Sequence, residues 1–538
     1  MSKRRASGNP STAPPKKRSN VVQLPSFGAE NEDDNQTPSN SLSTALSTRQ
    51  SSLGDVPSLV SISLRAFARA LLPLYENEQS WERTRRQLKG LPELLVTRLL
   101  SVLRKEIPTY LTHGLLVAHF IRGTEIALTG ELTGVHNLTL HAIPDNCPDL
   151  VHLELRDLKK PSDDVLSSVI SKLPALETLI LRGCTQAGSK TVATAARCSE
   201  LRVLNLNYTT PSASSIGALL IACPKLEVLK LAAIPKLNPS AISSWAKEIL
   251  SAESSEEPPL QQLLSLKLRG TGLNDSALIN LLSLTPNLER LDVSFTQVRS
   301  IACLSSLPRL RKLSLTSCPI NITRVELKKV PDLPHLEILH LGAVGVNGSP
   351  TLTDSALYAL TDLLEPLTRL ENVSLVGNSK LGLTSKKGDG ALADFVSRVG
   401  RKLAMLNLGG VPSLSSLDLR GLLADQEATS DVNPTPTPRL ESLTLSNTGV
   451  DNEAANYISA CRNLEALALE NTRFTNEGVF TIIDACEQLT RLDLTSCRGI
   501  HVTDRRRFFE VWEEARANQN AQPDVVEGEG RNRRRTRR

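Results

Sequence analysis

The chain repeats the pattern L-x-x-L-x-L, with valine replacing a leucine at some places, and this repetition restricts the fold more than any other feature. The alternation of apolar positions predicts a short strand in each copy, and most copies start 22 to 26 residues after the previous one. That period is typical of a solenoid built from one strand and one helix per repeat. The copies start at Leu150, Leu176, Leu201, Leu226, Leu263, Leu288, Leu310, Leu336, Leu370, Leu403, Leu440, Leu464 and Leu489, and a weaker copy starts at Val135.

The composition agrees with one long leucine-built array. Of the 538 residues 40% are hydrophobic but only 3% are aromatic, which disfavours several ordinary domains with separate cores. Four longer steps between repeats, of 33 to 37 residues, each contain an insertion that we expect to form a surface loop. The insertions are residues 251–259, 346–350, 380–390 and 426–439.

The second half of a repeat carries a helix start, as in Asn274-Asp275 and Thr353-Asp354, where the polar side chain is expected to cap the first turn. One repeat cannot bury its own leucines, so neighbouring repeats must stack with their strands roughly 4.8 Å apart. The predicted fold is therefore an α/β solenoid of horseshoe form. Parallel strands are expected on its concave side and helices on its convex side, with an N-terminal helical cap and disordered tails.

Several phrases resemble the ribonuclease-inhibitor-like, cysteine-containing leucine-rich repeats found in many ubiquitin-ligase receptors. They are CPDLVHLEL, CPKLEVLKL, CRNLEALAL and CEQLTRLDLTSCRGI, and the helix openings LTDSAL and LNDSAL. The resemblance covers about Val135 to Ile500 and implies the leucine-rich-repeat fold. The activator of the Ran GTPase has similar repeats, but that family ends in an acidic tail, whereas this chain ends RNRRRTRR.

Eight of the nine cysteines occupy two phases of the repeat, and only Cys303 lies outside them. Cys147, Cys198, Cys223, Cys461 and Cys486 stand three residues before the first leucine, and Cys184, Cys318 and Cys497 stand three residues after the last. In other repeats the second phase holds Thr209, Thr271, Thr296, Thr448, Thr472 or Asn378. This pattern predicts buried free thiols in a reducing compartment, without disulfides or a metal.

No motif of an enzyme or nucleotide-binding site occurs in the sequence. The histidines, among them His113, His119, His136 and His141, have no matched acid or thiol at a useful spacing. We therefore expect a binding protein that is not an enzyme and holds no cofactor or metal.

Residues 58 to 125 contain two amphipathic helical segments, SLRAFARALLPLYE from Ser63 and LKGLPELLVTRLLSVLRKE from Leu88. The first resembles the box by which cullin-ligase receptors bind elongin C, although Ala68 stands where cysteine is usual. The LPELLVTRLL segment also resembles an F-box, which implies a Skp-type adaptor, and capping of the solenoid is a further alternative. The resemblance places adaptor contacts at Ser63, Leu64, Phe67, Ala68, Leu72, Leu91 and Pro92.

These observations divide the chain into five predicted regions. They are a disordered tail over residues 1–57, a helical adaptor-like or capping module over 58–125, a solenoid of about 14 repeats over 126–504, a capping helix over 505–516 and a disordered Arg-rich tail over 517–538. A protein partner is expected on the concave face. Its contacts are predicted at Arg156, Arg182, Lys230, Lys267, Arg269, Arg290, Asp292 and Lys312, which alternate with the strand leucines.

The net charge of +5 at pH 7 is concentrated in the two tails. Lys3, Arg4 and Arg5 with Lys16, Lys17 and Arg18 match a two-part nuclear import signal, which predicts an import carrier as a partner and location in the nucleus, with cytoplasm as a second place. The C-terminal arginines predict at most weak, nonspecific nucleic-acid attraction. No apolar run suggests a membrane span.

The combined expectation is a nuclear substrate-recognition subunit of a cullin-type ubiquitin ligase. The alternative is a nuclear leucine-rich-repeat scaffold that serves DNA repair or chromatin assembly without a ligase connection. The overall order of helices followed by cysteine-containing repeats also resembles that of yeast-type excision-repair leucine-rich-repeat proteins.

Overall fold

The computed structural model describes residues 46–49, 58–252, 260–301, 304, 306–320, 333–343, 352–423 and 437–521. Residue contacts divide the chain into Met1–Thr44 and Ala45–Arg538, and all the described residues belong to the second unit. The six import-signal residues, Cys303, residues 522–538 of the Arg-rich C-terminal tail and most of three insertions lie outside the described residues.

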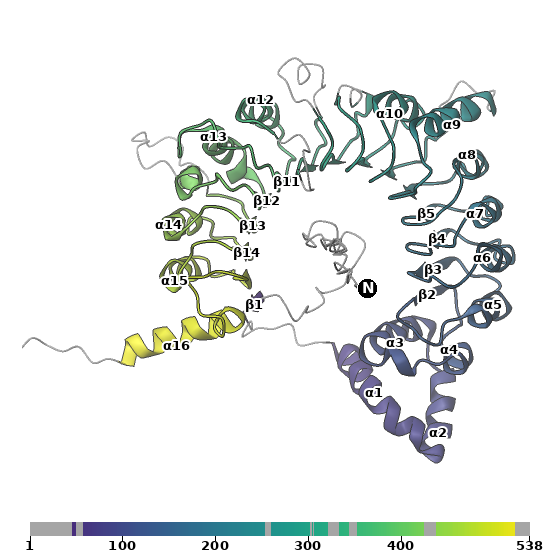
Figure 1. The fold of residues 1–538 in the computed structure, drawn as a ribbon. Coiled ribbons are helices and arrows are strands. Elements are labelled where there is room, and N and C mark those ends of the chain that lie inside the picture. The colour runs from purple at the N-terminus through teal and green to yellow at the C-terminus, as the bar shows by residue number, and fades with distance from the viewer. Residues whose placement is uncertain are drawn as a thin grey trace, which may run out of the picture. The chain divides into compact units, whose positions relative to one another are not determined.

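One sheet of fifteen strands runs through the described unit (Figure 1), and fourteen of them are parallel and follow one another in chain order. Each strand pairs with the next at the same phase of the repeat, so that Leu153 faces Leu179 and Leu179 faces Leu204. The parallel strands are β2 (Glu125–Thr129), β3 (His152–Arg156), β4 (Thr178–Ile180), β5 (Val203–Asn205), β6 (Val228–Lys230), β7 (Ser265–Lys267), β8 (Arg290–Asp292), β9 (Lys312–Ser314), β10 (Ile338–His340), β11 (Asn372–Ser374), β12 (Met405–Asn407), β13 (Ser442–Thr444), β14 (Ala466–Ala468) and β15 (Arg491–Asp493).

The thirteen repeats from Leu150 to Leu489 each form a strand, so the leucine-rich-repeat solenoid is confirmed. The leucines are buried between the sheet and the helices behind it; Leu150, Leu153 and Leu155 are each 0% exposed. Figure 1 shows the strands on the inner side of the curved array and the helices on its outer side. The helices are α5 (Asn137–Asn146), α6 (Asp163–Ile170), α7 (Ser189–Ala195), α8 (Ala213–Ala222), α9 (Pro239–Ala252), α10 (Asp275–Leu282), α12 (Asp354–Leu364), α13 (Ala391–Arg398), α14 (Ala455–Ile458) and α15 (Asn476–Ala485), with 3₁₀ turns at Gly400–Lys402, Ser416–Leu422 and Asn452–Ala454.

The predicted repeat start at Val135 is wrong, because the residues after it form α5 and the first parallel strand, β2, lies earlier in the chain. Leu138 and Leu140 would share one face of a strand, but Leu138 is 65% exposed and Leu140 is fully buried. A capping box between His136 and Thr139 starts the helix instead.

The helices before the solenoid are α1 (Leu59–Glu76), α2 (Glu78–Lys89), α3 (Glu93–Glu106) and α4 (His113–His119), with a 3₁₀ turn at Pro108–Tyr110. Arg122 attaches the turn between α2 and α3 to the first repeat. Its guanidinium donates hydrogen bonds to the carbonyl oxygens of Leu88 (2.8 Å), Lys89 (2.6 Å) and Leu91 (2.9 Å). None of the helices described is long and apolar enough to cross a membrane.

The C-terminal end of the sheet is covered by a short segment that comes from the N-terminal side of the chain. Strand β1 (Leu46–Thr48) pairs antiparallel with β15, beside the 3₁₀ turn Arg505–Arg507 and helix α16 (Phe508–Ala521). The prediction that residues 1–57 lack ordered structure is therefore wrong for β1, because its backbone completes the hydrogen bonds of the sheet edge.

Candidate functional site: the strand face

The strand face consists of the side chains that alternate with the buried leucines and point away from the core. In β3 these are His152, Glu154 and Arg156, while Leu153 and Leu155 point inward. The same phases recur in every parallel strand because the pairing keeps one register from β2 to β15. Residues that are far apart in the sequence thus form rows across neighbouring repeats.

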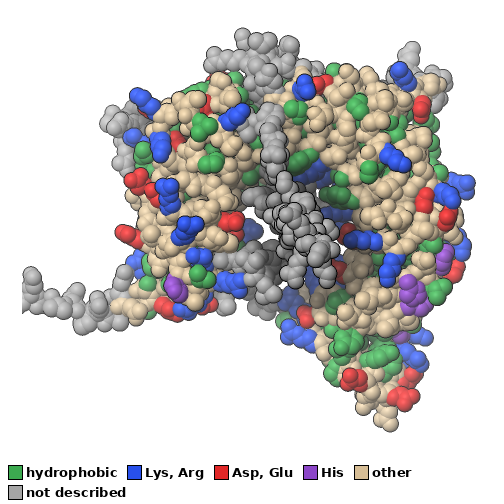
Figure 2. Space-filling view, in the orientation of Figure 1, with side chains coloured by type: hydrophobic (Ala, Val, Ile, Leu, Met, Phe, Trp, Pro, Cys, Tyr) green, Lys and Arg blue, Asp and Glu red, His purple; other side chains and the backbone are tan. Residues whose placement is uncertain are grey.

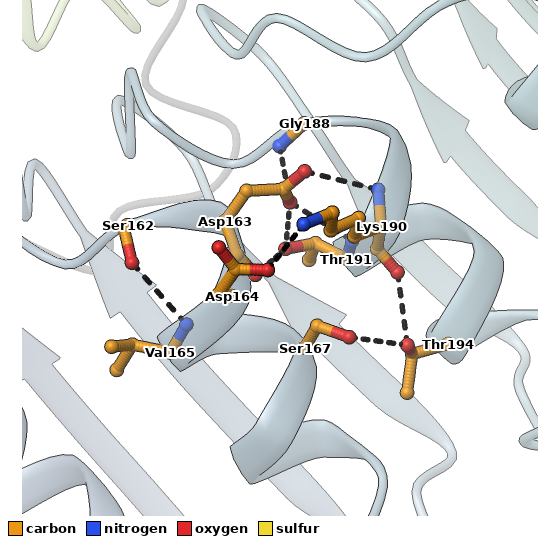
Figure 3. A network of polar contacts seen from close by, with 9 residues as sticks. All are labelled: Ser162, Asp163, Asp164, Val165, Ser167, Gly188, Lys190, Thr191 and Thr194. Carbon is orange, nitrogen blue, oxygen red and sulfur yellow. Dashed lines mark hydrogen bonds and ion pairs between the residues drawn. The ribbon is translucent and has the colours of Figure 1, made fainter.

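Hydrogen bonds between successive repeats hold these rows in place (Figure 3). Asp163, the first residue of α6, accepts hydrogen bonds from the backbone N–H groups of Gly188 (2.9 Å), Lys190 (3.0 Å) and Thr191 (2.9 Å) in the next repeat. The Thr191 hydroxyl donates to the same carboxylate at 2.6 Å. The Asp163 side chain therefore caps α7, while Ser162 caps α6.

The same arrangement recurs at other helix starts. Asn274 caps its own helix, as predicted, by accepting the Ala277 N–H at 3.0 Å. Asp275 beside it does not; its carboxylate accepts the backbone N–H groups of Arg299 and Ser300 in the next repeat, both at 2.9 Å. The helix-start acids therefore join repeats, and only the residue before each acid caps the helix.

Burial alone would raise the pKa of Asp163, but the hydrogen bonds from Thr191, Gly188 and Lys190 outweigh it and lower that pKa. Asp354 behaves in the same way: burial opposes ionisation, but the hydrogen bonds from Thr384, Gly382 and Ser385 leave its pKa lowered. Both carboxylates are therefore charged at neutral pH, which strengthens their bonds to the neighbouring repeat.

After twelve of the fourteen parallel strands, β3 to β9 and β11 to β15, the backbone turns through a left-handed residue at a fixed phase, seven residues after the first leucine. Glycine fills this phase at Gly183, Gly270, Gly377 and Gly410, and other residues with positive φ fill it at Asp157, Tyr208, Ala233, Phe295, Ser317, Asn447, Asn471 and Ser496. The sequence prediction missed this phase, although the recurring glycine and asparagine were a usable signal. Two aromatic residues, Tyr208 and Phe295, occupy it despite the strain.

The predicted partner contacts of β4 to β9 form one basic part of the strand face. Six basic side chains and one acid lie at the outward phases there: Arg182, Lys230, Lys267, Arg269, Arg290, Lys312 and Asp292. Lys267 contacts Asp292 (Nζ to Oδ2, 3.4 Å), and Lys230 and Lys267 face each other across β6 and β7. The Arg269 guanidinium lies 4.5 Å from the centre of the Phe295 ring.

Arg156 lies beside an acid of its own strand. Its Nε lies 2.6 Å from Glu154, and both side chains are mostly buried. Burial would raise the pKa of Glu154, but the hydrogen bond from His152 and the charge of Arg156 lower it. We therefore place Arg156 at the border of the basic part.

From β10 to β15 the strand face is mainly polar and uncharged, with Ser374, Asn407 and Thr444 at its centre. Two acids stand at its far end, and burial together with the charge of Asp493 raises the pKa of Glu470. Figure 2 shows Lys and Arg side chains along the inner side of the array.

The predicted adaptor residues are only partly accessible. Ala68 is fully buried, and Leu64 and Phe67 are half-buried and pack against the core, so the centre of the predicted box is covered by the chain itself. Ala68 is therefore not accessible to an adaptor in this structure. Ser63 and Pro92 are exposed, and Leu72 and Leu91 are half-buried.

Other apolar side chains of these helices point to solvent. Leu59 is 80% exposed, Ile62 45% and Leu94 66%. Leu59 and Ile62 lie three residues apart on α1 and so share one face of the helix. Figure 2 shows hydrophobic side chains gathered where α1 and α3 lie in Figure 1.

The eight described cysteines are buried free thiols, as predicted. Burial raises the pKa of Cys184 and Cys461 to about 12 and that of Cys147, Cys223 and Cys486 to about 11. Among the residues that the structure describes, no three His, Cys, Asp or Glu side chains form a group that could hold a metal ion.

No family model and no curated protein matches the chain. Among solved structures, the internalin InlF of Listeria monocytogenes is 19% identical over 69% of this chain and 87% of its own, with a TM-score of 0.38. A chain of the yeast complex of Rad7 and Elc1 is 18% identical over 79% of this chain and 96% of its own, with a TM-score of 0.43. The functional domain of InlJ of L. monocytogenes is 14% identical over 69% and 72%, with a TM-score of 0.33. These values are too low to transfer a function from any of the three.

Proposed function

We propose that the chain is a protein-interaction scaffold that acts as a nuclear substrate-recognition subunit of a cullin-type ubiquitin ligase. The strand face would hold the protein to be modified, and the helices before the solenoid would dock an adaptor. In this role the chain supplies proximity and no catalytic group. The observation that carries the proposal is the exposed apolar surface of the N-terminal helices, which a solenoid cap alone does not require.

The structure changes which residues of that surface we expect an adaptor to contact. The first turns of α1 and α3 are accessible, whereas the middle of α1 packs on the core. We therefore propose Leu59, Ile62 and Ser63 with Pro92 and Leu94 as the adaptor contacts, and helix-in-groove docking as the mode. Elongin C and a Skp-type protein both remain candidates for the adaptor.

Binding of purified adaptors to the full chain tests the proposal. We expect elongin C or a Skp-type adaptor to bind the wild type, and Ile62→Asp to weaken that binding at least tenfold because it places a charge in an apolar contact. Leu138→Asp is the matched control, since Leu138 is also an exposed apolar residue but lies on α5. If neither adaptor binds the wild type, the ligase role is wrong.

A nuclear scaffold for DNA repair or chromatin assembly without a ligase connection is the second candidate function. It needs the strand face but not the apolar surface of α1 and α3, so it predicts that Ile62→Asp leaves all partners bound. Affinity purification with the wild type and this variant separates the two functions.

The nuclear location rests on the two basic clusters near the N-terminus. A fluorescent fusion in which Lys3, Arg4, Arg5, Lys16, Lys17 and Arg18 are changed to Ala is expected to lose nuclear accumulation. Unchanged accumulation would contradict the assignment of these clusters as an import signal.

A further inference from the structure

We propose that the basic part of the strand face, from β4 to β9, binds an acidic peptide segment of the partner, and that Tyr208 and Phe295 position it. The inference rests on the proposed role of the strand face as the partner surface. It does not depend on which adaptor docks at the N-terminal helices, or on whether one docks.

The distribution of charge is the first argument. The outward phases of β4 to β9 hold six basic side chains and one acid, whereas those of β10 to β15 hold one Arg or Lys and two acids. Exposure to solvent alone does not require the two halves of the strand face to differ in charge. The facing pair Lys230 and Lys267 places two basic side chains side by side on adjacent strands of this part.

The aromatic residues in the left-handed turn are the second, independent argument. Tyr208 has a φ of 61° and Phe295 a φ of 59°, a conformation that costs a side chain about 1 kcal/mol and that glycine adopts freely. Glycine or asparagine fills the same phase in six other repeats. Asp157, Ala233, Ser317 and Ser496 fill it in the other four, so the aromatic rings and not the positive φ distinguish Tyr208 and Phe295.

Both aromatic residues lie within the basic part, three residues after the ends of β5 and β8. Phe295 holds the Arg269 guanidinium at 4.5 Å from its ring centre, which fixes the direction of that cation. Tyr208 is 49% exposed and presents a ring and a hydroxyl to a ligand. Within the basic part, Phe295 therefore fixes one cation, and Tyr208 offers an exposed ring.

The spacing of the strands suits a short extended peptide. Six strands at about 4.8 Å span about 24 Å, which is the length of about seven extended residues. Two aromatic residues, one of them already stacked on an arginine, do not make the continuous stacking platform that single-stranded nucleic acid uses. The geometry therefore favours an acidic peptide as the ligand.

Fluorescence anisotropy with the full chain and a labelled decaglutamate peptide tests the proposal. We expect binding that weakens with salt, and a loss of at least tenfold in Arg290→Glu. Arg491→Glu is the matched control, because both arginines begin an Arg-Leu-Asp strand at the same phase, in β8 and in β15. An equal loss in both variants, or no decaglutamate binding by the wild type, would overturn the proposal.

Tyr208→Asn distinguishes a ligand contact from a structural role. Asparagine tolerates the left-handed turn, as at Asn447 and Asn471, so we expect this variant to be at least as stable as the wild type. Binding of decaglutamate should nevertheless fall several-fold. Unchanged binding would exclude Tyr208 from the site.

A labelled ten-nucleotide single-stranded DNA tests the other class of ligand. If it binds more tightly than decaglutamate and loses affinity in Arg290→Glu, the ligand is a nucleic acid and the proposal is wrong. Adaptor binding is measured separately, so failure of the peptide experiment and failure of the ligase role are distinguishable.

Discussion

At the scale of single residues, the acid at the first position of a helix connects one repeat to the next. Asp163 accepts three backbone N–H groups and one hydroxyl of the following repeat, whereas its neighbour Asp164 bonds only the ammonium group of Lys190. The two adjacent acids thus differ in what they hold: one satisfies backbone donors, and the other forms an exposed ion pair. Their removal should have unequal effects.

Asp163→Asn is expected to lower the free energy of unfolding by about 1.5–3 kcal/mol, because charge-assisted hydrogen bonds to partly buried donors are lost. Asp164→Asn should change it by no more than about 0.5 kcal/mol, since its ion pair is exposed on both sides. Chemical denaturation measures both, and amide exchange at Thr191 locates the effect. Equal effects of the two substitutions would contradict this assignment.

The same pair gives a prediction for pH. The pKa of Asp163 is lowered in the folded chain, so its contribution is present above the unfolded pKa of about 3.9 and is lost as the pH falls through the folded value. The stability difference between wild type and Asp163→Asn should therefore be constant from pH 7 to pH 5 and shrink below pH 4. Denaturation measured from pH 7 to pH 3 checks this, and a constant difference would contradict it.

The free-energy cost of the left-handed backbone conformation can be measured at Gly270, which has a φ of 66°. A Cβ added there meets nothing closer than the Ala233 backbone at 4.0 Å, so Gly270→Ala measures backbone strain without a clash. We expect a loss of about 1 kcal/mol. Ala233→Gly, at the same phase of the preceding repeat, should change stability in the opposite direction because Ala233 has a φ of 56°. Thermal melting of both variants checks the pair.

At the scale of elements, the apolar alternation predicted the strands from β3 to β15, because a misplaced register would expose leucines in every repeat. It failed at the first repeat, where VHNLTL has the spacing of a strand but the caps and the burial of a helix. The cysteines were likewise predicted to be buried because they occupy fixed phases beside the buried leucines of the repeat. Periodicity is reliable where many repeats support it and weak where one segment stands alone.

The candidate site was less predictable than the fold. The basic side chains were found because alternation gives their direction, but periodicity does not reveal what covers a helix face. Ala68 shows this: the pattern placed it on an apolar face, and the chain's own core covers it. Strand β1 was missed because three residues in a polar segment have no periodic signal.

The Ser47 hydroxyl is one of the contacts between the β1 segment and the C-terminal helix; the Arg49 guanidinium, directly after β1, also lies over the rings of Phe509 and Trp512. Ser47 is buried, and its oxygen accepts the backbone N–H of Phe508 at 3.0 Å, at the first residue of α16. Ser47→Ala would leave this N–H without its partner and should cost about 1 kcal/mol. Thr48→Ala, at the exposed neighbouring position, is the control and should be neutral. Thermal melting and amide exchange of Phe508 measure the difference.

At the scale of the whole molecule, each parallel strand pairs with the next, and most of the described repeats also pack a helix against the helix of a neighbour, as α6 packs against α7. In such an array local unfolding at one end need not reach the other, because stability is a sum over neighbouring interfaces. The buried thiols report on this directly. Cys147 and Cys184 lie near the first strands, and Cys486 and Cys497 lie beside the last.

Ser47→Lys is expected to release β1, because a cation would be buried against the N–H groups that begin α16. Cys486 and Cys497 should then react faster with a thiol reagent, while Cys147 and Cys184 stay protected, since burial keeps these thiols unionised and covered. Mass spectrometry of the labelled peptides measures each site, with Thr48→Lys as the control. If all four cysteines gained reactivity together, the repeats would be coupled over the whole array, and β1 would hold more than the last repeat in place.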